Sequence, residues 1–361
     1  MIRGALPDFD IVIATRNRAD ALRMSIPLML NQSAKPQSLI VVDSSDDHAA
    51  VCRAIESAIC GFSGRVEVVA SSRGSSYQRN VGLKYVREPI VFFPDDDSMF
   101  YPGASEEILK IYQADSARDV GGVCTAEAFQ MPGDHLSEIT YRTGVLDNPM
   151  KRLLTLTRSF ERKFAPDPLM LTGQEFIASR AAPGWLAEHN AVLVEYMTGF
   201  RMTFRTESIA PHGFNELFIN YGLCEDVEAS LSVLKNQHLV GARNARIYHH
   251  KFPGARSGGR FFGVAQMLNR AYIVAKLAPQ DSNARRSVLR YNAYTVARHS
   301  RGALTSYGRA KLMGALAAAR CTGELLQCPS ENLADCYRAL WEKCTAQQAV
   351  KPLAAQRDSN A

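Results

Sequence analysis

The segment IVFFPDDD, residues 90–97, carries the clearest information about the fold. Four apolar residues are followed by Pro94 and by three adjacent aspartates, Asp95, Asp96 and Asp97. A short, uninterrupted apolar run is typical of a strand that is buried on both faces of a parallel sheet. Because ligands of such sheets bind beyond the carboxyl ends of the strands, aspartates at this position are candidates for a binding site.

Segments of strand type and of helix type alternate on both sides of this strand. Apolar runs predict strands at residues 10–14, 38–42, 66–70, 90–93 and 120–125, and helical spacing predicts helices at 19–31, 49–59, 75–86 and 104–113. Strict alternation of this kind favours an α/β fold with a parallel, doubly wound sheet. Asp43 follows the second strand, and we therefore expect its carboxylate in the same crevice as the three aspartates.

The chain after residue 125 divides into a part that is hard to interpret and a helix-rich part. Residues 126–195 mix Pro, Gly and a helical piece at 150–164, and we treat them as an insertion. Further strands are predicted at 202–204 and 245–248, and further helices at 226–235, 263–276, 285–298, 307–320 and 333–343, before a frayed tail from 351. We expect one α/β domain over residues 1–255 and a basic helical region over 256–361.

Composition excludes several classes of protein. The chain has 361 residues and contains no uncharged apolar run of about 18 residues, so we expect no membrane span. The first ten residues lack the charged-then-apolar pattern of a secretion signal, which favours a cytoplasmic protein. None of the eight cysteines forms a CxxC pair, so reduced, buried thiols are a better expectation than a zinc site.

Positive charge is concentrated in the C-terminal region. Between Lys251 and Arg320 the chain has thirteen basic residues, and Asp281 is the one acid. Such an excess should attract anions, for example phosphates, acidic lipid head groups or nucleic acid. For any single residue the simpler interpretation is a solvated helix face.

The three adjacent aspartates form a candidate cation site. Their carboxylates repel one another unless a cation neutralises them, although a solvated acidic turn is the alternative. In extended backbone Asp95 and Asp97 point the same way, so both can bind one hard cation. His249 and His250 follow a short apolar segment and face opposite ways, so one at most should complete the metal shell. We favour His250 and leave His249 open.

Two further groups are candidates for catalysis and binding. Glu225 and Asp226 open a predicted helix, where an acid either favours the helix dipole or serves as a general base. Arg79 lies on the helix before the aspartates and could contact a phosphate group or brace an aspartate. A surface arginine is an equally good interpretation of the spacing alone.

Taken in order, these motifs resemble the large family 2 of inverting glycosyltransferases. The resemblance extends over about residues 8–250 and depends on the order of several short motifs. They are Thr15-Arg16-Asn17-Arg18, Gln-x-x-x-Pro at 32–36, Val41-Val42-Asp43, Arg79-Asn80-Val81-Gly82, the aspartates, Gly-x-x-Met-x-Phe-Arg at 199–205, Gly-Phe-Asn-Glu at 213–216 and Glu225-Asp226.

The resemblance implies a nucleotide-binding domain of the glycosyltransferase A type, with a mixed, mainly parallel sheet and a helical C-terminal extension. It implies transfer of a sugar from a nucleoside-diphosphate sugar to an acceptor hydroxyl, with inversion, in the presence of Mn²⁺ or Mg²⁺. The roles that it implies are donor binding by Thr15, Asn17, Asp43, Arg79, Asp95 and Asp96, metal binding by Asp97 and His250, and proton abstraction by Asp226.

The sequence departs from the family pattern at two points. Asp43 is followed by Ser44, where many relatives have Asp or Asn, so the nucleotide stays open. The Gln-x-x-Arg-Trp motif of processive synthases is missing, because Gln266 and Arg270 are four residues apart and no Trp follows. We therefore expect single additions to a sugar, glycan or lipid-linked acceptor, with residues 126–195 on the acceptor side, in polysaccharide or glycoconjugate synthesis of the bacterial type.

Two alternative functions are compatible with parts of the pattern. A sugar nucleotidyltransferase also uses an α/β sheet and acidic ligands, but the loop after the first strand has no glycine. A non-catalytic protein that binds carbohydrate or nucleic acid is suggested by the basic helices alone, with nucleic acid the less favoured partner. The same helices make the inner face of an anionic membrane a candidate peripheral location.

Overall fold

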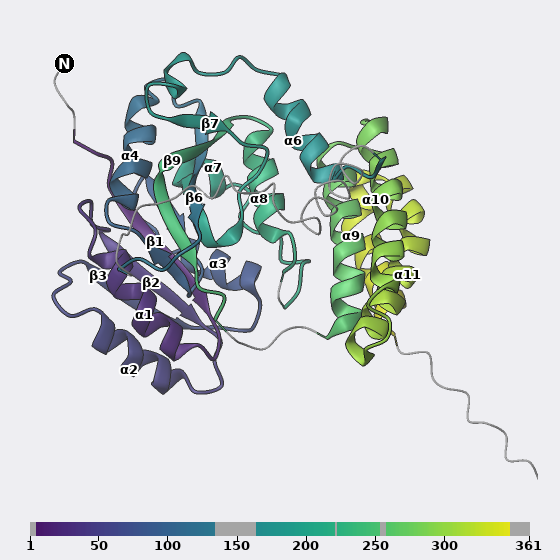
Figure 1. Cartoon of the computed structure of the whole chain (residues 1–361), viewed down its shortest axis with the longest axis horizontal. Coiled ribbons are helices and arrows are strands. Elements are labelled where there is room, and N and C mark those ends of the chain that lie inside the picture. Colours follow the sequence, from purple (N-terminus) through teal and green to yellow (C-terminus); the bar gives the residue numbers. More distant parts are fainter. Residues whose placement is uncertain (1–4, 134–163, 221, 253–257, 347–361) are drawn as a thin grey trace, which may run out of the picture.

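The computed structural model describes residues 5–133, 164–220, 222–252 and 258–346. Within them, the sheet consists of β1 (Phe9–Thr15), β2 (Ser38–Asp43), β3 (Arg65–Ala70), β4 (Ile90–Phe93), β5 (Ser98–Phe100), β6 (Val120–Ala128), β7 (Ala191–Leu193), β8 (Met202–Arg205) and β9 (His238–His249). The strands follow the order β3-β2-β1-β4-β8-β6-β9-β5, and β7 pairs with β9 (Figure 1).

Helices cover both faces of this sheet and continue into a C-terminal bundle (Figure 1). The α/β part contains α1 (Ala19–Leu30), α2 (His48–Ala58), α3 (Ser75–Leu83), α4 (Ala104–Ala114), α6 (Pro168–Ala178), α7 (Thr206–Ile209) and α8 (Glu225–Leu234). The bundle contains α9 (Gly259–Leu277), α10 (Ser282–Ser300), α11 (Ser306–Gln327) and α12 (Leu333–Thr345). Short 3₁₀ helices lie at Gly184–Leu186, Gly199–Arg201 and Ser330–Asn332.

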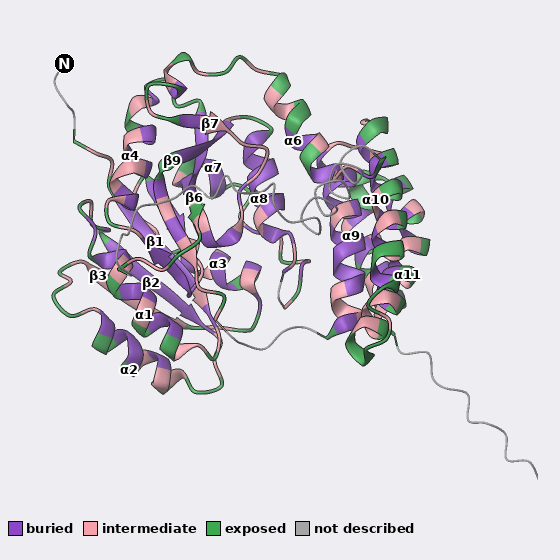
Figure 2. Cartoon of the chain, viewed as in Figure 1, coloured by how far each residue is buried: buried purple, intermediate pink, exposed green. Residues whose placement is uncertain are grey.

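Burial on both faces explains the apolar strands. Alternate residues of β1 point to opposite sides, so Val12 packs in one hydrophobic cluster and Ile11 and Ile13 in another. Figure 2 shows these central strands as buried and the outer faces of the helices as exposed. Helix α3 approaches β1 closely at Gly82, where any Cβ would clash with the Val12 side chain. The carboxyl ends of β1, β2 and β4 consequently meet beside the start of α3.

The sheet is mixed, as the family resemblance implies, and not wholly parallel. β1 pairs in parallel with β2 and β4, whereas β8 runs antiparallel to both β4 and β6. The alternation of elements could not show this, because the chain enters β8 only after residues 126–195. β9 is also longer than the predicted strand at 245–248, since Gly241 and Asn244 interrupt its pattern before the predicted segment begins.

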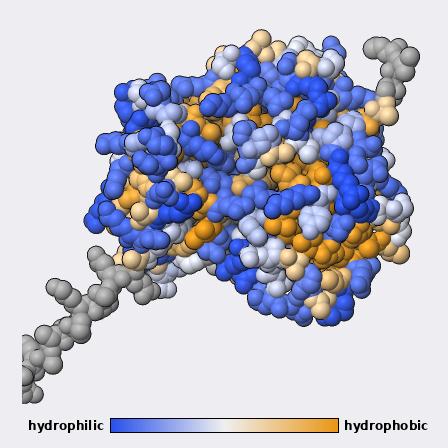
Figure 3. Space-filling model, turned by 180° about the vertical axis from the view of Figure 1, so that it is seen from behind, coloured by the Kyte–Doolittle hydropathy of each residue, from blue (hydrophilic) through white to orange (hydrophobic). Residues whose placement is uncertain are grey.

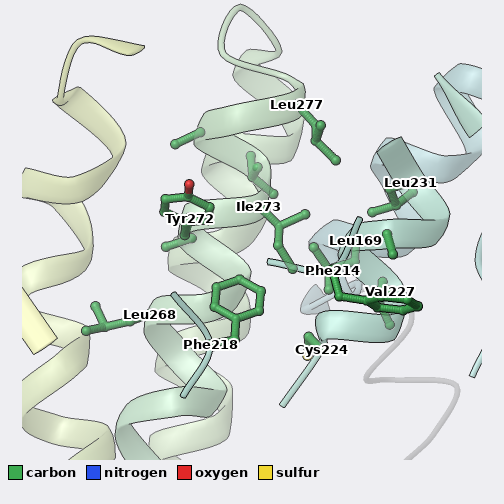
Figure 4. Close-up of a cluster of buried hydrophobic side chains, with 14 of the residues drawn as sticks. Leu169, Phe214, Phe218, Cys224, Val227, Leu231, Leu268, Tyr272, Ile273 and Leu277 are labelled. Atoms are coloured by element: carbon green, nitrogen blue, oxygen red, sulfur yellow. The ribbon is translucent and has the colours of Figure 1, made fainter. Parts of the chain in front are cut away.

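The helical bundle is joined to the α/β part through a shared hydrophobic core. Figure 4 shows Tyr272 and Ile273 of α9 in one cluster with Phe218 and with Val227 of α8. Within the bundle α9 crosses α11 closely, because Gly263 lies where a Cβ would clash with the Lys311 carbonyl. α9 is accordingly buried along most of its length.

Several expectations lie partly or wholly outside the described residues. The helical piece predicted at 150–164 falls almost entirely there, as do the tail from 351 and the proposed boundary at 255. The described part of the insertion contains α6 and β7, which were not predicted. No helix in the described ranges is long and apolar enough to cross a bilayer. The side seen in Figure 3 mixes hydrophilic and hydrophobic residues over both parts of the molecule.

Candidate functional site

A cleft of about 430 Å³ lies beyond the carboxyl ends of β1 and β4. The loop after β1, the start of α3, the turn after β4, the 3₁₀ helix at Gly199–Arg201 and the start of α8 all contribute to its walls. The charged residues that line it are Arg16, Arg18, Arg73, Arg79, Asp95, Asp96, Glu225 and Asp226, together with His249. With the end of β9, which carries His249, six separate segments of the chain therefore meet at one opening.

The turn after β4 directs its three carboxylates into different surroundings. The Asp95 side chain is 32% exposed and accepts a hydrogen bond of 2.8 Å from Arg79 Nη2. Asp96 is buried and accepts bonds from Thr15 Oγ1 at 2.8 Å and Arg18 Nη1 at 2.9 Å. Burial raises the pKa of Asp96 to about 7, although the Arg18 charge opposes the shift. Thr15 and Arg18 thus fix the middle of the turn and leave Asp95 facing the cleft.

Asp95, Asp97 and His249 form a cluster whose ligand atoms all lie within 4.8 Å of one another. Asp97 Oδ1 is buried and accepts no hydrogen bond from the described residues, and it lies 3.3 Å from His249 Nε2. Burial favours the neutral acid, but the neighbouring His249 holds the pKa of Asp97 below its usual value. Two carboxylates, one of them with an unpaired buried oxygen, and an imidazole fit a divalent cation such as Mn²⁺ or Mg²⁺.

Strand pairing determines which histidine joins this cluster. His249 is opposite Ser98 in the β5–β9 ladder, and its ring stacks on Phe200 with centroids 4.6 Å apart. The ring of His250 lies instead between Tyr248 and Phe252, with a buried Nδ1 that has no described partner. The structure therefore favours His249 as a ligand, and His250, which was favoured from the sequence, lies outside the cluster.

Arg79 connects the aspartate turn to the start of α8. Its Nη2 donates to Asp95 and its Nη1 donates to Glu225 Oε1 at 2.7 Å. The guanidinium also lies 5.4 Å from the centroid of the Phe214 ring. The buried side chain braces an aspartate, which was one of the two roles considered from the sequence. Because both carboxylates depend on it, Arg79 fixes the separation of the two acidic segments.

Asp226 lies across Gly199 from Asp95. Its Oδ2 accepts a 2.8 Å hydrogen bond from Gly199 N, and its Oδ1 accepts one from Val227 N. A Cβ on Gly199 would lie 3.5 Å from Asp95 Oδ1 and 3.6 Å from Asp226 Oδ2, so both carboxylates border the same small space. Burial raises the pKa of Asp226, with Arg79 acting against the shift. A carboxylate with a raised pKa is suited to accept a proton.

Two other residues that were expected to bind the sugar donor, Asn17 and Asp43, form hydrogen bonds within the protein. Asn17 lines the cleft in a left-handed conformation with φ of 55°, and its Nδ2 donates to Asp46 at 2.8 Å. Asp43 does not line the cleft, because its carboxylate is fully buried. It accepts a bond from Ser45 N at 2.9 Å and pairs with His48 Nδ1 at 2.7 Å. Asp43 therefore supports the loop behind the cleft and is not grouped with the aspartates.

Some residues of the site were missed from the sequence. Gln78 Nε2 donates to the carbonyls of Thr15 and Val42, each at 2.8 Å, and so joins the ends of β1 and β2. A polar residue on the sheet-facing side of a predicted helix was the available signal. Arg18 was part of a quoted motif, but only its contact with Asp96 shows what it does.

Comparison with known proteins shows a sequence similarity to one enzyme family. Residues 10–165 match the sequence model described as Glycosyl transferase family 2. Succinoglycan biosynthesis protein ExoU of Rhizobium meliloti (strain 1021) is 29% identical over 112 residues, which are 30% of this chain and 32% of ExoU. The match thus spans about a third of that relative.

Two solved structures share the fold over most of the chain. S. aureus TarS 1–349 in complex with UDP-GlcNAc superimposes with a TM-score of 0.52 and 14% identity, covering 93% of this chain and 90% of that TarS fragment. The same TarS fragment described without a ligand gives 0.51 and 13%, with the same coverage. The α/β architecture, the mixed sheet and the C-terminal helices agree with glycosyltransferases of the A type. Residues 10–165 thus match glycosyltransferase family 2, and the chain as a whole has the fold of A-type glycosyltransferases.

Proposed function

We propose that this chain is a glycosyltransferase that uses a nucleoside-diphosphate sugar as donor, requires a divalent cation and inverts the anomeric configuration. The observation that carries the proposal is that Asp95 and Asp226 border one space at Gly199. A metal-capable cluster and a carboxylate of raised pKa are thereby within one cleft. The match of residues 10–165 to the family 2 model argues against the nucleotidyltransferase and the non-catalytic alternatives.

Donor binding follows from the charges of the cleft. Asp95, Asp97 and His249 would hold Mn²⁺ or Mg²⁺, which would neutralise the diphosphate and its departing charge. Arg16, Arg18 and Arg73 line the same cleft and add positive charge. Thr15, Asn17, Arg79, Asp95 and Asp96 stay proposed as residues that bind or position the donor.

Asp226 is the proposed general base. The acceptor hydroxyl attacks the anomeric carbon from the side opposite the nucleotide, which inverts that carbon, while the Asp226 carboxylate takes the hydroxyl proton. The Gly199 and Val227 amides hold the two carboxylate oxygens in place during this step. Fixed donors of this kind orient a base without rearrangement as charge moves.

The test compares Asp226→Asn with the unchanged protein. The variant keeps the shape of the side chain and one of the two oxygens that accept from the Gly199 and Val227 amides, so it should fold and bind Mn²⁺ and nucleoside diphosphates. Transfer should fall by about 10²- to 10⁴-fold, the usual range for loss of a general base. Product stereochemistry by NMR tests inversion, and activity after chelation tests the metal. Near-normal transfer by Asp226→Asn would contradict the role of the base.

An anionic surface is the proposed environment of the acceptor, which we expect to be a lipid-linked glycan. Residues 282–320 contain eight basic residues and no acid. On α11, Arg309, Met313, Leu316 and Arg320 are exposed at helical spacing, and Leu304 is 92% exposed beside them. Basic residues with interspersed apolar side chains suit an acidic lipid interface. Flotation with phosphatidylglycerol vesicles should show salt-sensitive binding, and equal binding to neutral vesicles would contradict it.

A further inference from the structure

Four of the eight cysteines lie on one helical hairpin. Cys321 and Cys328 are at the C-terminal half and cap of α11, seven residues apart. Cys336 and Cys344 lie on α12, eight residues apart. Two helical turns are about seven residues, so each pair shares one side of its own helix. The two helices pack together and are joined through the short 3₁₀ helix at Ser330–Asn332.

The hairpin places these thiols opposite one another in two pairs. At the far end, Cys344 Sγ lies 3.6 Å from Cys321 Sγ, and both residues are buried. Near the turn, Cys336 lies close enough to Cys328 for the Cys328 thiol to influence its titration, and both are half-buried. The spacing of the cysteines on α11 thus matches their spacing on α12. As a result, two thiol pairs lie one after the other between the two antiparallel helices.

The arrangement differs from a zinc site. Four thiolates around zinc must converge on one point, with zinc–sulfur distances of about 2.3 Å. Among the described residues, the groups of three or more ligands close enough for a metal consist of Asp95, Asp97 and His249 alone. The four cysteines therefore form two separate pairs.

We propose that these two thiol pairs are redox modification sites, at which Cys328–Cys336 and Cys321–Cys344 become disulfides that join α11 to α12. The co-reactant is a small-molecule disulfide. One thiolate attacks it and releases one small thiol. The second cysteine then attacks the mixed disulfide and releases the other, so two protein thiols lose two electrons and two protons while the reagent is reduced to two thiols.

Exposure sets the order of the two reactions. Cys328 and Cys336 can be reached by a reagent because both are half-buried, whereas the Cys321–Cys344 pair is enclosed by the core. Burial, and then the thiol of Cys328, raises the pKa of Cys336 to about 11, and burial raises that of Cys344 to about 12. Because the thiolate is the nucleophile, oxidation should be slow at neutral pH and faster in alkaline buffer.

The two disulfides would hold α12 in place against α11, and α12 is the helix whose Tyr337 packs on the core of the α/β part. Tyr337, next to Cys336, contacts Phe218 and Tyr272, and Trp341 lies between the two cysteines of α12. The closed loops span eight and 23 residues, so both disulfides should restrict the unfolded chain. A rise in melting temperature of about 5 °C or more is expected.

The experiment uses the full chain with Cys60→Ser, which removes an exposed thiol. The protein is incubated with oxidised glutathione at pH 8.5, digested without reduction and mapped by mass spectrometry. The expected result is two intramolecular links, Cys328–Cys336 before Cys321–Cys344, with the higher melting temperature reversed by dithiothreitol. Stable glutathione adducts on these cysteines, other pairings, or four unmodified thiols would each overturn the proposal.

Two variants identify the pairs separately. Cys328→Ser, at a half-buried position, should abolish the Cys328–Cys336 disulfide and leave the Cys321–Cys344 disulfide. Cys321→Ser should abolish the Cys321–Cys344 disulfide and leave the other. If Cys321→Ser fails to fold, Cys328→Ser still tests the proposal. Cys124→Ser is the matched control, because Cys124 is buried in the α/β part and should change neither link.

Discussion

His249 Nε2 lies 3.3 Å from Asp97 Oδ1, while the adjacent His250 has its ring among Tyr248 and Phe252. This difference predicts that His249→Ala weakens Mn²⁺ binding and His250→Ala does not. Mutation of a residue that orients a metal ligand typically lowers metal affinity by about 10- to 100-fold, and loss of a ligand itself should lower it at least as much. Calorimetric titration with Mn²⁺ measures both. Equal losses in the two variants would remove His249 from the proposed metal shell.

Gly199 separates Asp95 from Asp226, which predicts sensitivity to one added methyl group. In Gly199→Ala the Cβ would lie 3.2 Å from Arg79 Nη2 and would project between the two carboxylates. We expect a fall in turnover of about tenfold or more, because small displacements of reacting groups are costly. Stability should change little, since the neighbouring atom ends a side chain.

Gly184→Ala is the matched control for this prediction, because a Cβ there meets no atom within 4 Å. The measurement is the turnover of each variant with a nucleotide-sugar donor, and we expect it to fall in Gly199→Ala and not in Gly184→Ala. Unchanged turnover in Gly199→Ala would show that the reacting atoms lie elsewhere in the cleft.

A hydrogen-bonded connection runs from the helical bundle to the segment that carries the proposed base. Tyr337 on α12 donates to Asn269 Oδ1 at 2.7 Å, and Asn269 Nδ2 donates to the Leu223 carbonyl at 2.6 Å. Leu223 precedes Cys224, a non-glycine residue with φ of 73°, and then Glu225 opens α8. The strained turn before α8 is therefore held by the bundle.

Tyr337→Phe should lower turnover by about fivefold with little change in KM for the donor, because one hydrogen bond contributes about 1 kcal/mol. The ring, and with it the packing, is retained. Tyr307→Phe, at an exposed position on α11, is the control. A large loss of stability without a loss of turnover at permissive temperature would assign Tyr337 a purely structural role.

The sequence predicted the central strands well because their signal is local. Continuous apolar runs such as residues 38–42 and 90–93 form buried strands, and the carboxylates after them were readable from the same pattern. β8 could be recognised as a strand, but its antiparallel direction depends on the path of residues 126–195. Direction is a property of the connection and not of the strand.

The parts of the site that could not be predicted depend on contacts between distant residues. Alternation along a strand predicts that His249 and His250 point apart, but only the pairing with Ser98 selects His249. Asp43 was expected beside the other aspartates because it too follows a strand. Its pairing with His48, five residues later, turns the carboxylate away from the cleft. Neither contact has a signature in one sequence.

His299 in α10 predicts how the stability of the bundle depends on pH. It is buried, and its Nε2 lies 2.9 Å from Gln266 Oε1. Burial, with Lys311 and Arg298 nearby, lowers the pKa of His299 to about 4. The His299 imidazole is protonated near pH 6.5 in the unfolded chain and only near pH 4 in the folded chain. The contribution of neutral His299 to folding stability is therefore present above pH 6.5 and is lost as the pH falls toward 4.

His299→Gln should remove this part of the pH dependence. Between pH 7.5 and 4.5 the unchanged protein should lose about 1–2 kcal/mol more unfolding free energy than the variant, a value discounted for residual contact with water. Urea unfolding at the two pH values measures the difference. His212→Gln, at an exposed position, serves as the control and should follow the unchanged protein. If His299→Gln loses as much stability as the unchanged protein on acidification, other groups titrate in this range, and the bundle does not depend on a neutral His299.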